Sequence, residues 1–168
     1  MLVEMNLAGV RIELPSNQPI VLLRESAGSR FLPIWIGPPE AASIANALQG
    51  SAPPRPNTHD LMCDLLREVG VTVVRVAITE LRDGTFYAVI AMRRNGSEYE
   101  VSARPSDAIA VAVRLGCKIL ASSEVLDEAS ITLDGEGDRE GGADPEAEVE
   151  RFRAFLEGVT PEDFGPTG

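Results

Sequence analysis

The stretch VTVVRVAITELRDGTFYAVIAMRRNGSEYEVSA, residues 71–103, decides the fold of this 168-residue chain. Its first part, residues 71–81, is dense in β-branched side chains, which favour extended strands. Asp83-Gly84 and Asn95-Gly96 are both dipeptides typical of type I′ turns, which join neighbouring antiparallel strands. The stretch therefore predicts a three-stranded antiparallel meander.

Two further strand signals precede this meander. Apolar residues alternate through residues 3–14 with a break at Ala8-Gly9, which indicates a strand with a bulge or kink. Residues 20–25 and 30–36 flank a short polar turn and predict a hairpin. Because Pro33 has no N–H to donate, it predicts that the second of these strands lies at an edge or carries a bulge.

Helical spacing of apolar residues, bounded by proline, Thr, Ser or glycine, marks the remaining segments. It predicts helices over residues 40–48, 58–69, 105–115 and 145–158, a short helical turn over 123–126, and one more short strand over 118–121. The predicted fold is α+β, with a mixed, mainly antiparallel sheet of hairpins and meander packed against four to five helices.

The charge distribution divides the chain. Residues 1–126 contain 12 Arg and Lys against 13 Asp and Glu, whereas residues 127–168 contain 3 against 13. We expect one domain over residues 1–130, an acidic flexible linker over 131–144, and a C-terminal amphipathic helix and tail over 145–168. That helix cannot stand alone in water, so it docks on its own chain or on a protein partner.

Composition also narrows the functional classes. Apolar runs are far shorter than the roughly 20 residues that a membrane span needs, and the N-terminus lacks a signal-peptide pattern. With only Cys63 and Cys117, both in apolar surroundings, we expect buried reduced thiols and a cytoplasmic protein without membrane partners. Neither half carries a long basic stripe, which disfavours tight binding to duplex DNA.

The only histidine, His59, lies where a basic, proline-rich loop meets a predicted helix. Thr58 is the candidate cap of that helix, Asp60 lies in its first turn, and Arg55 precedes it in the loop. Together these groups are able to hold an anion and move a proton. The alternative is structural: Thr58 caps, Asp60 complements the helix dipole, and His59 is an ordinary polar residue.

A second helix start repeats this pattern with Arg104, Pro105, Ser106 and Asp107. If the two starts meet, Arg55, Arg104, Ser106 and free backbone N–H groups face one anion, which makes a phosphate site. The alternative is again local, with Asp107 as a first-turn residue of its own helix and Arg104 in a salt bridge.

Glu40, Asp60 and Asp107 are three carboxylates at predicted helix starts. Carboxylates are the ligands that Mg²⁺ and Mn²⁺ prefer, so these residues are the candidate metal ligands. The chain has no phosphate-binding Walker loop and no dinucleotide-binding glycine pattern, and we therefore expect no organic cofactor.

Four ordered motifs carry a resemblance to a known family. They are Leu32–Gly37 (LPIWIG) with Glu40, Pro54–Leu61 (PRPNTHDL), Asp83–Tyr87 (DGTFY) and Ala103–Ile109 (ARPSDAI). Over about residues 1–130 the chain resembles the bifunctional nuclease domain family. The resemblance implies an α+β domain, a homodimer or larger homo-oligomer, and cleavage of DNA and RNA.

Two hypotheses follow. In the first, the chain hydrolyses phosphodiester bonds, preferably in single strands: Asp60, Asp107 and Glu40 hold a metal ion, Arg55 and Arg104 stabilise charge, and His59 transfers a proton. In the second, the chain is a non-catalytic module that binds a small anion or shapes an oligomer interface, while the acidic tail engages a protein partner.

Overall fold

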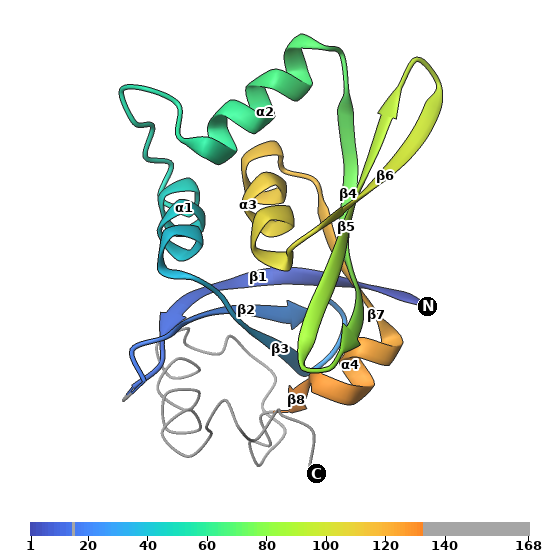
Figure 1. Ribbon diagram of the computed structural model, residues 1–168. Coiled ribbons are helices and arrows are strands. Elements are labelled where there is room, and N and C mark those ends of the chain that lie inside the picture. The colour runs from blue at the N-terminus through green and yellow to red at the C-terminus, as the bar shows by residue number, and fades with distance from the viewer. Residues whose placement is uncertain (15, 133–168) are drawn as a thin grey trace.

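The computed structural model describes residues 1–14 and 16–132, which form one eight-stranded sheet and four helices (Figure 1). In chain order the elements are β1 Leu2–Ile12, β2 Pro19–Glu25, β3 Arg30–Trp35, α1 Pro38–Leu48, α2 Thr58–Glu68, β4 Thr72–Arg82, β5 Thr85–Arg94, β6 Ser97–Ala103, α3 Pro105–Leu115, β7 Lys118–Ser122, α4 Ser123–Ala129 and β8 Ile131–Thr132. The α+β class expected from the sequence is confirmed.

The meander of β4, β5 and β6 forms as the sequence predicts. Its strands pair antiparallel, and the dipeptides Asp83-Gly84 and Asn95-Gly96 join them. All four turn residues have positive φ, with values of 51° and 71° in the first turn and 50° and 79° in the second. This conformation matches the right-handed twist of the paired strands, which explains why these two dipeptides predict the hairpins.

The N-terminal strands also agree with the sequence. The β1–β2 register shifts between Leu7 and Gly9, and Gly9 has a φ of 147°, so the predicted bulge lies where the alternation breaks. Pro33 pairs with Leu22 of β2, while β8 covers only Arg30 and Phe31 on the other side of β3. The missing N–H of Pro33 therefore lies on a part of β3 that no described strand pairs on that side.

The centre of the sheet depends on β7. The strand order is β6-β5-β4-β7-β1-β2-β3-β8, and β7 pairs parallel to β4 and antiparallel to β1. Every other pair of described strands is antiparallel. Thus a five-residue strand joins the meander to the N-terminal hairpin, with α3 as the crossover that leads from β6 into β7.

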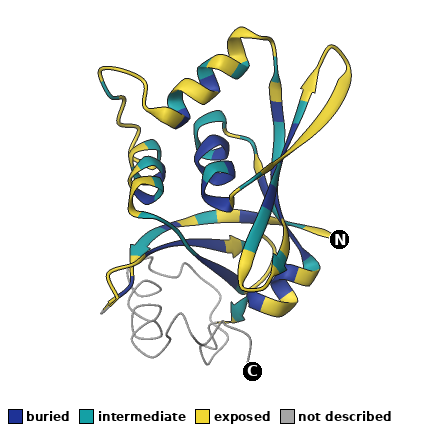
Figure 2. Ribbon diagram, in the orientation of Figure 1, coloured by how far each residue is buried: buried dark blue, intermediate teal, exposed yellow. Residues whose placement is uncertain are grey.

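The buried core lies between the sheet and α3 (Figure 2). Residues 108–112 of α3 are fully buried, because small Ala and Val side chains let this helix pack on the sheet and also against α1 and α2. Cys63 of α2 is buried in the same core and Cys117 is partly buried. Both thiols are free, and burial raises the pKa of each.

The face that α2 turns to the core differs from the apparent apolar stripe. His59, Cys63 and the partly buried Leu66 face inward, whereas Leu61, Leu65 and Val69 are exposed. The reason is a contact between distant segments: α2 packs on the small residues of α3 through the face that carries the polar contacts of His59. The spacing predicted the helix correctly, but most of the apolar residues that carry the spacing lie on its exposed side.

The end of the described chain adds one short element. Ile131–Thr132, which the sequence assigns to the linker, form β8 against β3, and the remaining linker and the helix predicted within 145–168 lie outside the described residues. Ser122 caps α4 by accepting the N–H of Val125 at 3.2 Å. No helix among residues 1–14 and 16–132 is both long and apolar enough to cross a membrane.

Candidate active site at three helix starts

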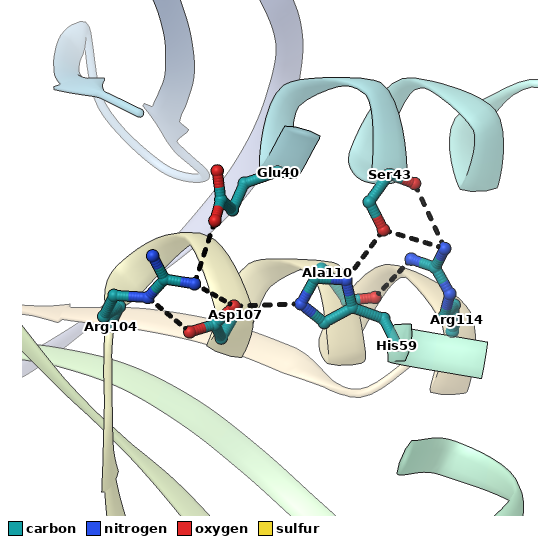
Figure 3. A network of polar contacts seen from close by, with 7 residues as sticks. All are labelled: Glu40, Ser43, His59, Arg104, Asp107, Ala110 and Arg114. Carbon is teal, nitrogen blue, oxygen red and sulfur yellow. Dashed lines mark hydrogen bonds and ion pairs between the residues drawn. The ribbon is translucent and has the colours of Figure 1, made fainter. Parts of the chain in front are cut away.

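The starts of α2 and α3 meet through a direct hydrogen bond. His59 Nε2 lies 2.9 Å from Asp107 Oδ1, and its Nδ1 lies 2.8 Å from Ser43 Oγ of α1 (Figure 3). His59 is 8% exposed, so the imidazole connects three helices inside the protein. The two helix starts are therefore in contact, which is what a functional role of His59 requires.

The partners of His59 determine where its protons lie. The ionised carboxylate of Asp107 only accepts hydrogen bonds, so Nε2 carries a proton and donates it. In the neutral ring Nδ1 then accepts the hydroxyl proton of Ser43. The result is an ordered Ser43–His59–Asp107 chain of hydrogen bonds.

Arg104 closes this chain at its exposed end. Its Nε donates to Asp107 Oδ2 at 2.7 Å, and its Nη2 donates to Asp107 Oδ1 at 3.0 Å and pairs with Glu40 Oε1 at 2.9 Å. The side chain of Arg104 is 65% exposed, against 23% for Asp107 and 17% for Glu40. Accordingly Arg104 is the member of the network that faces solvent, and the two carboxylates fix its position.

Arg114 holds the other end of the network. Its Nε donates to Asp60 Oδ1 at 2.7 Å, its Nη2 donates to the carbonyl and hydroxyl oxygens of Ser43 at 3.2 and 3.0 Å, and its Nη1 donates to the carbonyl of Ala110. The guanidinium is 10% exposed and touches α1, α2 and α3. Arg114 therefore locks the three helices in the arrangement that brings Ser43 to His59.

Sequence reasoning did not find Arg114 or Ser43. A basic residue in the last turn of a helix is explained by the helix dipole, and a serine in an Ala-rich helix gives no motif. The one available signal was indirect: Arg114 follows a run of small apolar residues in α3, and a largely buried arginine there requires an acidic partner.

The electrostatics of the carboxylates follow from these contacts. The hydrogen bond from Arg114, followed by the backbone N–H of Asn57 at 2.9 Å, lowers the pKa of Asp60 below its ordinary 3.8. For Asp107, burial acts to raise the pKa, but hydrogen bonds from Arg104 and His59 outweigh it and lower the pKa below 3.8. The pKa of Arg104 is raised, chiefly by its hydrogen bond with Asp107. All three groups are thus charged at neutral pH.

The three predicted metal ligands do not converge. Arg104 lies between Glu40 and Asp107, while Asp60 pairs with Arg114 instead. Within residues 1–14 and 16–132 no group of three or more His, Cys, Asp and Glu side chains is arranged to hold a metal ion. In this arrangement the three carboxylates do not fit a shared Mg²⁺ or Mn²⁺ site, because a guanidinium already neutralises each of them.

Two further residues differ from the sequence interpretation. Asn57, not Thr58, is the cap residue of α2, and Thr58 is the first residue of the helix. Arg55 is exposed and forms no hydrogen bond or ion pair with any described residue, so it is not part of the network. Arg55 is therefore not among the residues that the helix starts bring together.

A cavity of about 720 Å³ adjoins the network at Arg104. Its wall includes Trp35, Gly37, Phe86, Arg104 and Ser106, and it extends to the β4–β5 turn. His59 and Asp60 are not part of the wall. The cavity and the buried network therefore share Arg104 as their point of contact.

Fold and site together define an α+β domain whose polar centre is built from the starts of three helices. The family model of the bifunctional nuclease domain matches residues 21–134. The chain belongs to the bifunctional nuclease domain family, as its motifs indicated.

Individual relatives cover the chain to different extents. An uncharacterized protein of Mycobacterium tuberculosis, strain H37Rv, is 48% identical over 165 residues, which are 98% of this chain and 99% of that protein. Bifunctional nuclease 1 of Oryza sativa subsp. indica is 30% identical over 103 residues, 60% of this chain and 30% of that protein. The similarity to the rice protein is thus limited to one part of each chain.

The role of Arg114 is testable by substitution. Arg114→Ala leaves the carboxylate of Asp60 and the oxygens of Ser43 without their donor, and we expect the free energy of unfolding to fall by about 3 kcal/mol. The control is Arg67→Ala, which removes an exposed ion pair with Asp64 on α2 and should change it by less than about 1 kcal/mol. Urea denaturation measures both. Equal losses in the two variants would contradict the locking role.

The lowered pKa values of Asp60 and Asp107 predict acid sensitivity. Because both lie below the ordinary 3.8, their stabilisation is complete above that pH and is lost as pH falls through the folded-state pKa values. We expect Asp60→Asn to be less stable at neutral pH and to lose less stability on acidification. Denaturation at a series of pH values measures this, with Asp64→Asn on the same helix as control. An unchanged acid slope in Asp60→Asn contradicts the assignment.

Proposed function

We propose that this protein hydrolyses phosphodiester bonds in DNA and RNA, with Arg104 as the residue that meets the substrate phosphate. The observation that carries the proposal is the Glu40–Arg104–Asp107–His59 network, in which the one largely exposed group is a guanidinium held by two carboxylates. Membership of the family and the name of the rice relative, bifunctional nuclease, support the same reaction class.

In this proposal each residue has a distinct task. Arg104 donates from Nε and Nη2 to the carboxylates, whereas its Nη1 has no partner among the described residues and is free to bind a phosphate oxygen. A guanidinium fixed before the substrate arrives stabilises the charge that develops on the phosphorus oxygens at little reorganisation cost. Arg104 is therefore the proposed electrophilic group.

Asp107 and His59 supply the proton-handling part of the proposal. The carboxylate of Asp107 orients the attacking water and accepts its proton, while the Nε2–H of His59 donates to that carboxylate and holds it in place. Oxygen of the water bonds to phosphorus, the bond to the departing sugar oxygen breaks, and that oxygen takes the proton from Asp107. Ser43 and Arg114 act as positioning residues, because they reach the substrate only through His59.

The expectation of Mg²⁺ or Mn²⁺ stays a prediction. Glu40, Asp60 and Asp107 do not form a shared site as they are paired, so no step of the proposal is routed through an ion.

A single-stranded substrate is favoured because residues 1–126 are nearly neutral and carry no basic track along which a duplex could bind. We also propose a cytoplasmic location, which the free Cys63 and Cys117 support.

A second candidate function is a non-catalytic binding module. The observation that favours it is the burial of His59, whose two ring nitrogens are both engaged by protein groups. In that case the network only shapes the site and Arg104 only binds an anion. The two candidates differ in one outcome, the cleavage of a phosphodiester bond.

The nuclease proposal predicts a clear loss on substitution. Arg104→Gln and Asp107→Asn should each lower kcat/KM on a labelled single-stranded oligonucleotide by about 100-fold, since each removes a charge that the transition state uses. Arg104→Lys should be more active than Arg104→Gln but less active than the wild type, because lysine keeps the positive charge but lacks the planar guanidinium with its several N–H donors. Arg93→Gln, which breaks the exposed pair with Glu98 on the meander, is the matched control.

The same assay includes arms with chelator, Mg²⁺ and Mn²⁺, and circular dichroism verifies that each variant is folded. Cleavage that persists at the wild-type rate in folded Arg104→Gln and Asp107→Asn proteins contradicts the proposed mechanism. Absence of cleavage from the wild-type chain under every metal condition favours the binding module.

We further propose that the chain forms a homodimer or larger homo-oligomer through α2. The helix exposes four large apolar side chains on one surface: Leu61, Met62, Leu65 and Val69, at 49%, 36%, 57% and 50%. A contiguous exposed apolar stripe of this kind is typical of an interface between proteins. In a monomer this apolar stripe would stay in water, at a free-energy cost.

This proposal predicts a change in mass in solution. Leu65→Glu should shift the protein to the monomer in light scattering coupled to size exclusion, because a charge in an apolar interface is not compensated. Val101→Glu, on the exposed edge strand β6, should leave the oligomer intact. If Val101→Glu dissociates the oligomer and Leu65→Glu does not, the interface lies on β6 instead.

A further inference from the structure

The cavity beside Arg104 has the size and the lining of a small-molecule site. Its volume of about 720 Å³ lies within the range of roughly 300–1,000 Å³ that is common for ligand pockets. It is bounded by the start of α1 at Gly37, the start of α3 at Arg104 and Ser106, and the β4–β5 turn. With Trp35 of β3 and Glu128 of α4, segments from several parts of the chain therefore border it.

Ser106 is the most informative residue of the wall. It is 6% exposed, yet its hydroxyl has no hydrogen-bond partner within residues 1–14 and 16–132. No side-chain polar atom in those residues is both buried and unpaired, so this hydroxyl is accessible from the cavity. Since Ser106 lines the cavity, a polar ligand there would provide the missing partner.

The start of α3 adds further donors at the same place. No side chain caps this helix, and its first backbone hydrogen bond runs from the N–H of Ala108 to the carbonyl of Arg104. The N–H groups of Ser106 and Asp107 are therefore left without acceptors among the described residues. With Nη1 of Arg104, these donors suit one phosphate group.

Aromatic rings occupy other parts of the wall. Trp35 and Phe86 both line the cavity, and the indole N–H of Trp35 is 3.3 Å from Glu13 Oε2, which fixes the ring. Aromatic faces at this position suit a nucleobase, because every base offers a π-surface for stacking. A bare inorganic anion would make no use of them.

Acidic residues on the rim limit the class of ligand. Asp83 and Glu128 also line the cavity. Carboxylates accept hydrogen bonds from sugar hydroxyls and base amino groups, and they disfavour a ligand with many negative charges. The lining thus matches a ligand with one phosphate, a sugar and a base.

We propose that this cavity binds one nucleotide, with the phosphate at Ser106, the start of α3 and Arg104, and the base against Trp35 and Phe86. The proposal names the substrate subsite of the nuclease described above and rests on that function. According to this proposal, the protein recognises the nucleotide that lies next to the cleaved bond.

The single tryptophan provides a direct probe, because Trp35 is the only one in the chain. Titration of the full-length protein with adenosine 5′-monophosphate should quench its fluorescence in a saturable way, whereas inorganic phosphate and adenosine should each bind more weakly. Ser106→Ala should weaken binding of the monophosphate by about 5- to 10-fold, as expected for the loss of one hydrogen bond. Ser97→Ala, an exposed serine on β6, is the matched control.

A second variant separates binding of the base from binding of the phosphate. Phe86→Leu keeps an apolar side chain but removes the ring, and it should reduce the preference for the monophosphate over inorganic phosphate. Calorimetry provides an independent readout in case the variant alters the fluorescence itself. Equal affinity for inorganic phosphate and the monophosphate would overturn the proposed base contact.

The outcomes for this site and for the nuclease are distinct, because adenosine monophosphate contains no phosphodiester bond. Saturable binding that Ser106→Ala weakens, together with absence of oligonucleotide cleavage, supports the cavity and rejects the nuclease. Cleavage without any binding of the monophosphate rejects the cavity and leaves the nuclease. Binding that is identical in Ser106→Ala and the wild type also rejects the assignment.

Discussion

The carboxylate of Asp107 is the junction on which the polar centre depends. It accepts hydrogen bonds from Arg104 on one side and from His59 on the other, so a single side chain fixes the guanidinium fork and the tautomer of the imidazole. Its place in the first turn of α3 is what allows this, because α1 and α2 both pack on that helix. Without the carboxylate, Arg104 and His59 have no common partner.

The parts of the fold that the sequence predicts are those with local causes. The turns at Asp83-Gly84 and Asn95-Gly96, the bulge at Gly9 and the start of α3 at Pro105 all follow from the backbone preferences of a few adjacent residues. The same is true of the candidate site: Asp107, Arg104 and His59 were identified because each lies in or next to a first helical turn. Local chemistry marks these positions whatever the rest of the chain does.

What the sequence could not predict depends on contacts between distant segments. The insertion of β7 between β4 and β1 joins the meander to the N-terminal hairpin, and each of these two parts is predictable from the sequence by itself. The five residues of β7 carry no signal that specifies both of its neighbouring strands. Arg114 meets Asp60 across 54 positions and Ser43 across 71. The buried face of α2 depends on the same kind of contact, since its buried residues are His59 and Cys63 and not the larger apolar residues.

The solvent exposure of the side chains decreases from Arg104 through Asp107 to His59. Arg104, which lines the cavity, is thus connected through Asp107 to the buried histidine. Two carboxylates hold the guanidinium of Arg104 in position before a ligand binds. Binding therefore costs little side-chain entropy at Arg104. Any negative charge brought to Arg104 also competes with Asp107 and Glu40 for the same cation. A shift of Asp107 away from Arg104 would strengthen its hydrogen bond with His59, which links ligand binding in the cavity to the position of the histidine.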